Sequence, residues 1–587
     1  MKRLLCYMKG YGKESVLGPL FKLLEASFEL LVPLVMAAII DTGVANGDRG
    51  YILRMGGVLL LLGFVGLAAS ITAQYFSAKA AVGFAGRLRH ALFEKVESLS
   101  FSQLDALGAS TVITRMTSDI NQVQTGVNLA LRLLLRSPFI VFGAMVMAFT
   151  VDAKSALVFV GVIPLLALVV FGVMLWTIPQ YRRVQAGLDG VLGKTRETLS
   201  GARVLRAFAR EDAEIAAFEE KNAALTRMQR FVGRVSALMN PLTYALINLA
   251  VLVLLNTGAL QVDAGHITQG ELVALVNYMS QILVELIKLA NLIITITRAL
   301  ASANRVAAVL DLPSGNAAME EAQSAAPKPV PGAPAVAFEG VGLAYDNAGA
   351  ESLSDISFRA EPGETIGVIG GTGAGKSSLV NLIPGFYAAT RGHVRIFGTD
   401  VQDWPAAALR AAVGVVPQKA VLFKGTIGEN LRWGCSDAPD DALWDALARA
   451  QARDFVEQKE GGLDAPVEQN GRNFSGGQRQ RLTIARALVR KPAILILDDS
   501  ASALDYATDA KLRHAIRAME GGPTVFLVSQ RAASIRHADK IIVLDDGRIA
   551  GIGTHAQLLA SCPVYQEIYD SQFPREKHAG ASAGKEA

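Results

Sequence analysis

Residues 155–178 read SALVFVGVIPLLALVVFGVMLWTI, and this apolar run indicates how the first half of the chain folds. It carries no charge over more than the roughly 20 residues that a helix needs to cross a bilayer. It is too long and too continuous for a helix in the core of a soluble domain. Similar runs recur before residue 300, so the sequence predicts six membrane-spanning helices, near 16–41, 52–78, 133–151, 155–178, 239–262 and 271–297.

The connections between these runs alternate between short and long. The short ones hold only Arg49 and Lys154 as basic residues, whereas the long ones are rich in Arg and Lys, counted up to Arg136 at the start of the third run. Basic residues favour the cytoplasmic side, so the long connections and both termini are predicted to be cytoplasmic. Apolar residues spaced by three and four, as in 204–208, predict that the long connections continue the spans as helices.

Composition excludes several classes of protein. Of the 587 residues 51% are hydrophobic and 19% are charged, whereas a soluble domain carries about 25% charged residues. The chain is therefore not an ordinary cytosolic enzyme. A net charge of +4 is too small to indicate a nucleic-acid partner. Three widely spaced cysteines (Cys6, Cys435 and Cys562) form neither a disulfide framework nor a metal cluster.

The composition changes at about residue 311. Residues 1–310 are predicted to form the membrane domain, and 311–334 are rich in Pro, Ala and Gly and read as a linker. Residues 335–572 alternate short apolar strands with helical patterns, which predicts an α/β domain with a mostly parallel sheet. The last residues, 573–587, are a polar tail.

Residues 370–377 read GGTGAGKS and fit the phosphate-loop pattern G-x4-G-K-[ST]. The loop follows the strand ETIGVIG and precedes the helical SSLVNLI, which is the context that phosphate binding requires. Its glycines let backbone N–H groups turn toward phosphates. Lys376 is predicted to neutralise the β and γ oxygens, and Ser377 to offer its hydroxyl to Mg²⁺. A chance Gly-rich turn is the weaker interpretation.

Other segments are ambiguous when taken alone. The strand AILILDD ends in Asp498 and Asp499, which fit a Mg²⁺ ligand and a general base but could also be a helix cap. SGGQ, at 475–478, fits an anion site at a helix start or a plain turn. Gln418 ends the strand VGVVPQ without a unique role, and Tyr345 could be an adenine platform or a core residue.

The order of phosphate loop, VPQ, SGGQRQR, LILDD and SALD resembles the ATP-binding cassette (ABC) transporters. STVITRMTSDINQVQ and ETLSGARVLRAFARE in the long connections, and IIVLDDGRIAGIGTHAQLL near the end, look like the exporter branch of that family. The resemblance covers nearly the whole chain. It implies a half-transporter in which six membrane helices are fused to one nucleotide-binding domain, and two such chains pair to form two composite ATP sites.

The resemblance implies ATP and Mg²⁺ as cofactors and a role for each motif. Tyr345 would stack on adenine, Gln418 would contact Mg²⁺ and the membrane half, and Asp498 would hold the ion with Ser377. The implied phosphate cradle is Gly370, Gly371, Thr372, Gly373, Ala374, Gly375, Lys376, Ser377 and Ser378. The implied cap on the partner's ATP is Ser475, Gly476, Gly477 and Gln478. Ser502 to Asp505 would communicate between the two sites, and Glu468 falls where the family places a coupling segment. The cytoplasmic turns near Ser118–Gln122 and Ser200–Phe208 would be coupling helices that press on the nucleotide domains.

Two residues depart from the family pattern, and both belong to the site built on this chain's phosphate loop. Asp499 stands where the family has a catalytic Glu. Because Asp is one methylene shorter, its carboxylate is set back by roughly 1.5 Å, and a misplacement of about 1 Å can lower the reaction rate on the order of 100-fold. Gln530 stands where the family has His, and an amide cannot carry a proton. The signature segment, which would complete the ATP site of the partner chain, keeps Ser-Gly-Gly-Gln, and only the Leu of the family pattern is replaced, by Phe474.

This asymmetry predicts the weakly hydrolysing half of a heterodimeric exporter that moves amphipathic small molecules, drugs or lipids, across the plasma membrane. A homodimer with two slow sites remains an alternative. A membrane-bound ATP sensor is a second one, which the six spans and the coupling extensions disfavour, and an importer is a third. Neither a nucleic-acid partner nor a particular cargo is indicated.

Ionisable residues occur at unusual depth in the predicted spans. Lys22, Glu25 and Glu29 share one helical face in the first, and Glu285 and Lys288 share a face in the sixth. Charges in a span usually face a cavity or a partner. They therefore either line a cavity for cationic or amphipathic cargo, or Glu285 simply pairs with Lys288 while Lys22 extends toward the cytoplasm; the second interpretation is slightly favoured.

Overall fold

The computed structural model describes residues 2–314, 327, 330–345, 349–500, 504–519 and 521–573. It divides into two compact units. The helical unit comprises Met1–Val96 and Ser110–Leu312, and the α/β unit comprises Glu97–Ala109 and Pro313–Ala587. Most of the predicted linker and all but one residue of the predicted tail lie outside the described residues.

Among the described residues, six helical stretches are long and apolar enough to cross a membrane, and they contain the six predicted runs: Gly12–Val44, Arg49–Glu97, Ala109–Val151, Ala153–Ser200, Glu211–Asp263 and Gln269–Leu310. Each is longer than its apolar run, as predicted for spans that continue beyond the bilayer. Only 6% of the most apolar window of the second stretch is buried within the chain. An apolar surface of this kind calls for lipid or a partner.

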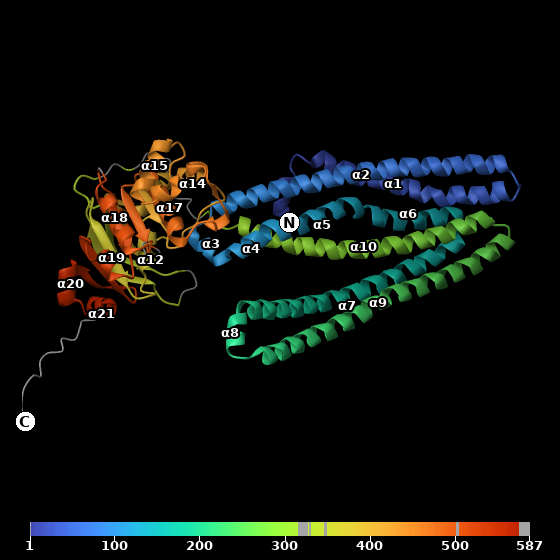
Figure 1. The fold of residues 1–587 in the computed structure, drawn as a ribbon. Helices are drawn as coiled ribbons and strands as arrows, with labels where there is room; N and C mark the ends of the chain where they lie inside the picture. Colours follow the sequence, from blue (N-terminus) through green and yellow to red (C-terminus); the bar gives the residue numbers. More distant parts are fainter. Residues whose placement is uncertain are drawn as a thin grey trace, which may run out of the picture. The chain divides into compact units, whose positions relative to one another are not determined.

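The helical unit is built from α1 and α2, from α4 to α10 and from three short helices (Figure 1). α10 is its central element and packs against α1, α5, α6, α7 and α9. The buried Tyr278 hydroxyl of α10 donates to the Leu30 carbonyl of α1 at 2.7 Å. The bounds are η1 Lys2–Met8, α1 Gly12–Ala38, η2 Ile39–Val44, α2 Arg49–Glu97, α4 Ala109–Thr114, η3 Arg115–Asp119, α5 Ile120–Leu133, α6 Arg136–Val151, α7 Ala153–Ser200, α8 Ala202–Ala207, α9 Glu211–Asp263 and α10 Gln269–Leu310.

Of the two predicted cytoplasmic turns, the one near Ser200–Phe208 is present as a break in the helices and the one near Ser118–Gln122 is not. The short α8 separates α7 from α9 inside the predicted segment Ser200–Phe208. Ser118–Gln122 instead lies inside a continuous helical path, from the π-helical η3 into α5. The break before it comes at Gly108 (φ 73°), which follows the short helix α3 (Phe101–Leu107).

The α/β unit contains a four-stranded antiparallel sheet in the order β2-β1-β4-β5, a six-stranded sheet in the order β12-β11-β3-β10-β9-β6, and the small pair β7-β8. In the larger sheet only β12 is antiparallel. The strands are β1 Val336–Leu343, β2 Leu353–Ala360, β3 Thr365–Gly370, β4 Arg391–Ile396, β5 Thr399–Asp400, β6 Val413–Val416, β7 Gly425–Thr426, β8 Pro466–Val467, β9 Ile494–Asp498, β10 Thr524–Val528, β11 Lys540–Asp545 and β12 Arg548–Gly553.

Helices cover this sheet, and both of its faces are buried. Along β10, Phe526 and Val528 join the core shared with β1 and β2, whereas Val525 and Leu527 join the core shared with α17 and α18. Burial on both faces explains the continuous apolar strands. The helices are α12 Lys376–Leu382, η4 Val401–Asp403, α13 Ala406–Ala412, α14 Ile427–Arg432, α15 Asp440–Arg449, α16 Arg453–Glu457, η5 Gly462–Asp464, η6 Gln469–Gly471, α17 Gly476–Val489, α18 Tyr506–Arg517, α19 Ala532–Ile535, α20 His555–Ser561 and α21 Pro563–Gln572.

The parallel strands explain where the site lies. Because β3, β6, β9 and β10 run in the same direction, their carboxyl ends meet at one edge of the sheet. The residues that follow these ends include Gly371, Gln418, Asp499 and Gln530.

Candidate nucleotide site

The phosphate loop connects β3 to α12, and its backbone requires glycine. Gly373 (φ 87°) and Gly375 (φ 91°) adopt left-handed conformations that other residues rarely take. A Cβ added to Gly370 would lie 2.2 Å from the Leu544 carbonyl oxygen. The loop therefore has the tight geometry that its sequence pattern predicts.

Lys376 is the first residue of α12, and its ammonium is held inside the loop. Its Nζ donates to the carbonyl oxygens of Gly370 at 3.0 Å and Gly371 at 2.6 Å. Burial lowers the pKa of Lys376, and the charges of Asp499 and Asp498 oppose this. A phosphate group would be a stronger partner than these carbonyls, because both members of the bond would then be charged.

Asp498 ends β9 and is buried beside the loop. Its Oδ1 accepts from the Ser377 hydroxyl at 3.2 Å. Burial raises the pKa of Asp498, the Ser377 bond lowers it, and the neighbouring charge of Asp499 raises it. Within the described residues no three His, Cys, Asp or Glu side chains gather to hold a metal. The oxygens of Ser377, Asp498 and Gln418 fit Mg²⁺, which uses few protein ligands together with substrate phosphates.

Asp499 has an unusual backbone, with φ at 43°. Its amide donates to the Val528 carbonyl of β10 at 3.0 Å, and its carboxylate hydrogen-bonds with Gln418. Burial raises the pKa of Asp499, while the charges of Lys376 and Arg531 and the Gln418 bond oppose the rise. The backbone and the side chain of Asp499 are thus both held by hydrogen bonds, which limits how far its carboxylate can extend into the cavity.

One cavity of about 450 Å³ brings most of the predicted residues together. Its predicted lining residues are Thr372, Gly373, Gly375, Lys376, Ser377, Ser378, Gln418, Asp498, Asp499 and Gln530. The sequence motifs did not indicate Glu351, Ser352, Asp546 and Gly547, which also line the cavity. The Asp-Gly turn after β11 could have indicated the last two, because Asp546 (φ 44°) and Gly547 (φ 75°) are both left-handed.

Tyr345 lies beside the cavity rather than in its lining. Its hydroxyl donates to the Ser378 Oγ at 2.9 Å, and its ring meets Tyr387 edge to face with 5.1 Å between centroids. Tyr387 in turn donates to the Asp105 carboxylate at 2.6 Å, and Phe101 packs on Phe386 at 4.6 Å. The segment 97–109, assigned by its sequence to the membrane half, thus belongs to the α/β unit and packs there through α3, which the sequence did not reveal.

The signature segment lies at the start of α17, apart from the cavity. Ser475 and Gln478 form a capping box, with Ser475 Oγ accepting from the Gln478 amide at 3.3 Å and the Ser475 amide donating to Gln478 Oε1 at 2.9 Å. Phe474 is buried in the core, which accommodates its substitution for Leu. Gly476 has open space around it. Exposed Glu468 precedes this segment, and Ser502 and Ala503 lie outside the described residues.

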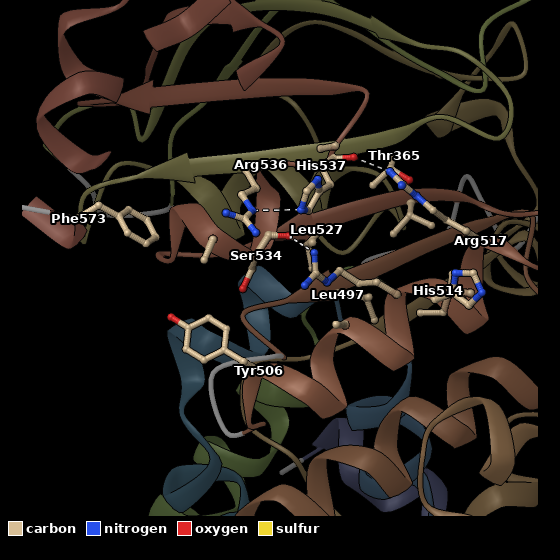
Figure 2. Close-up of a pocket in the computed structure, with 16 residues that line it drawn as sticks. Thr365, Leu497, Tyr506, His514, Arg517, Leu527, Ser534, Arg536, His537 and Phe573 are labelled. Atoms are coloured by element: carbon tan, nitrogen blue, oxygen red, sulfur yellow. Dashed lines mark hydrogen bonds between the residues drawn. The ribbon is translucent and has the colours of Figure 1, made fainter. Parts of the chain in front are cut away.

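Figure 2 shows a second cavity of the α/β unit, of about 510 Å³, that contains none of the predicted site residues. Here Arg513 donates to the Ser534 carbonyl at 3.1 Å and Arg517 to the His537 carbonyl at 2.5 Å. These bonds join α18, which follows Asp505, to the region of α19, which follows Gln530. Arg513 and Arg517 therefore connect the helix that follows Asp505 to the segment that follows Gln530.

The ionisable residues of the helical unit pair with one another. Arg136 donates to Glu285 and to Glu29, each at 2.6 Å, and Lys288 donates to Glu285 at 2.8 Å. Lys22 pairs with Glu25. The predicted pair of Glu285 and Lys288 is confirmed, whereas the expected extension of Lys22 toward the cytoplasm is wrong, because Lys22 is buried against Glu25 and Ser70. Arg136, counted in the sequence among the basic residues of a connection, is instead buried at the centre of the network.

The chain was compared with known proteins. The profile of the ABC transporter transmembrane region matches residues 15–286, and the ABC transporter profile matches residues 353–502. An uncharacterized ABC transporter ATP-binding protein of Mycobacterium tuberculosis is 37% identical over 96% of this chain and 97% of its own. One of Bacillus subtilis is 35% identical over 98% and 99%.

An ATP-dependent lipid A-core flippase of Hahella chejuensis is 30% identical over 97% of each chain. Among solved structures, a bacterial Atm1-family ABC exporter with ATP bound aligns with a TM-score of 0.76 over 97% of this chain and 99% of its own, at 24% identity. The predicted fold class, six membrane helices followed by an α/β nucleotide-binding domain, is confirmed. The chain is a multi-pass membrane protein of the ABC transporter family, with the fused architecture of an exporter.

Proposed function

We propose that this chain is the degenerate half of a heterodimeric exporter of amphipathic small molecules. Its own phosphate loop would bind ATP with Mg²⁺ and turn it over slowly, while Ser475–Gln478 would complete a faster site on the partner chain. The α/β unit and both termini would be cytoplasmic. The observation that carries the proposal is that Asp499 and Gln530 line the same cavity as Lys376.

The chemistry of this cavity explains the assignment. Lys376 would bind the phosphates, Tyr345 would stack on the base, and Ser377, Gln418 and Asp498 would hold Mg²⁺, which supplies charge neutralisation at the transferred phosphate. A general base must reach the attacking water, and the fixed, short Asp499 holds its carboxylate back. Gln530 can donate a hydrogen bond but cannot carry a proton. Both changes slow hydrolysis and leave the groups for nucleotide binding in place.

A second chain is supported by the short helix α8 and the residues on either side of it. Leu199 and Phe208 are each 74% exposed and Val204 is 60% exposed, although this segment lies far along the helices from the apolar runs. Apolar side chains that are exposed away from lipid mark an interaction surface. The flippase relative supports a lipid-like cargo among the amphipathic molecules.

The test is the subunit composition of a tagged complex extracted from native membranes and weighed intact by mass spectrometry. A second, different chain of similar size supports the heterodimer. A single species at twice the mass of this chain refutes it and leaves both sites dependent on Asp499 and Gln530. ATP-dependent flux into inverted vesicles separates a transporter from a non-transporting ATP sensor.

A further inference from the structure

A cavity of about 640 Å³ lies within the helical unit, between α7, α9 and α10. Its volume falls within the range of about 300–1,000 Å³ that is typical of sites for drug-sized ligands. None of the residues that line this cavity was predicted as a site residue, and the charged network around Arg136 lies outside it. All of the residues that form it belong to one compact unit.

The lining changes from apolar to cationic along each helix. On α7 it passes from Met174 and Ile178 to Arg182, and on α10 it passes from Ile294 to Arg298. Met174, Ile178 and Ile294 belong to one apolar cluster. Eight residues separate Met174 from Arg182, which is about 12 Å of helix. Arg298 follows directly after the predicted run 271–297, and Arg182 lies four residues beyond the end of the run 155–178. The cationic end would therefore lie near the edge of the bilayer and the apolar end within it.

The two arginines have no acidic partner near this cavity. No Asp or Glu occurs in residues 153–188 of α7, 221–262 of α9 or 286–310 of α10. Asp189, the next acidic residue along α7, accepts from Gln185 at 3.3 Å. Among the described residues neither Arg182 nor Arg298 has a hydrogen bond or an ion pair, whereas the adjacent Arg183 donates to Gln180 at 3.5 Å.

Polar side chains between the apolar and the cationic end keep hydrogen-bonding capacity that their mutual contacts do not use. The Tyr181 hydroxyl and the Ser236 Oγ lie 3.4 Å apart, and Tyr181 is 49% exposed. Asn291 adds an exposed amide on α10. A ligand with an apolar body and a charged, hydrogen-bonding head would match this order of side chains.

We propose that this cavity binds the exported molecule and selects amphiphiles with an anionic head, such as a phosphate or a carboxylate. Arg182 and Arg298 would contact the head, and the cluster around Met174 would contact the apolar body. The inference rests on the proposed export function and narrows its cargo from amphipathic molecules in general to anionic ones. Guanidinium groups suit this role because they match phosphate and carboxylate in bidentate geometry.

The test uses the full complex as it purifies, in nanodiscs of phosphatidylcholine. Dodecyl phosphate and dodecyltrimethylammonium are the probes, since they share one tail and carry opposite charges. Binding is followed by calorimetry and by stimulation of ATP hydrolysis. We expect dodecyl phosphate to bind more tightly than dodecyltrimethylammonium. R182Q or R298Q should lower the affinity for dodecyl phosphate about tenfold or more, as for loss of a charge-assisted hydrogen bond. R183Q is the matched control and should change affinity less than about twofold.

Three results would overturn the inference. They are tighter binding of the cationic probe, an unchanged dodecyl phosphate affinity in R182Q and R298Q, or an equal loss in R183Q. Nanodiscs with phosphatidylglycerol identify the source of the anion. If the arginines serve only bilayer headgroups, the variants change the response to phosphatidylglycerol and leave the response to dodecyl phosphate unaltered, which also refutes a cargo site. Failure of the export function would show separately, as the absence of ATP-dependent flux in the unaltered complex.

Discussion

Disrupting the ion pair between Arg136 and Glu285 should destabilise the helical unit strongly. The side chains of Arg136 and Glu285 are 7% and 3% exposed. The Glu285 carboxylate accepts from Arg136, from the Ser137 hydroxyl at 2.8 Å and from Lys288 at 2.8 Å. These contacts join α6 to α10, and the second bond of Arg136, to Glu29, adds α1.

The magnitude follows from what each substitution leaves unpaired. Removing one partner of a buried ion pair costs about 3–5 kcal/mol. In Glu285→Gln, Arg136 keeps Glu29 and Ser137 keeps an acceptor, so we expect a loss near the lower limit, about 3 kcal/mol. Arg136→Met leaves Glu285 with Ser137 and Lys288, and the expected loss is again about 3 kcal/mol. The double variant leaves no buried charge without its partner, so it should lose about 3 kcal/mol rather than about 6.

The assay is unfolding by SDS in mixed micelles, followed by fluorescence, for the parent, both single variants and the double variant. Lys288→Met is the control, because its side chain is 43% exposed and its bond to Glu285 should contribute less than about 1 kcal/mol. Additive losses in the double variant, or a loss in Lys288→Met equal to that in Glu285→Gln, would refute the argument that burial of the pair sets its energy.

Three further predictions concern the nucleotide site. Asp499→Glu should raise turnover at this site by on the order of tenfold and should need Gln530→His for more, measured as phosphate release with the partner's site inactivated; full recovery by the single change would exclude a role for Gln530. Lys376→Ala should weaken ATP photolabelling of this chain by at least about 100-fold, and unchanged labelling would contradict the phosphate role. Burial raises the pKa of Asp499, and a base acts only when ionised, so turnover at this site should fall on acidification at a higher pH than for an exposed carboxyl; an identical acidic limb in Asp499→Asn would reject Asp499 as the base.

Much of the architecture could be predicted because its causes are local. Continuous apolar runs predict spans, and a glycine loop between a strand and a helix predicts the cradle around Lys376. The gathering of Gln418, Asp499 and Gln530 follows from the rule that parallel strands end at one edge. These arguments need only the order of elements along the chain.

Contacts between distant segments could not be predicted in the same way. Arg136 looked like one more basic residue of a connection, since only tertiary packing places it against Glu285. The helix α3 has an ordinary capping box at Ser100 and Gln103, but nothing in its seven residues indicates Tyr387 as its partner. The turn expected at Ser118–Gln122 was wrong because the preceding Gly108, not the polar residues, ends the short helix.

The contacts of Tyr387 have a thermodynamic consequence. Its hydroxyl holds Asp105 of α3, and its ring touches Tyr345, whose hydroxyl reaches Ser378 beside the phosphate loop. If nucleotide rests on Tyr345 and Ser378, as we propose, it shares these side chains with the docking of α3. Linkage then requires reciprocity: if bound nucleotide tightens the hold on α3 by a given factor, a tightly held α3 raises the affinity for nucleotide by the same factor. In that case the two tyrosines would couple nucleotide occupancy of the phosphate loop to the order of a segment seven residues long.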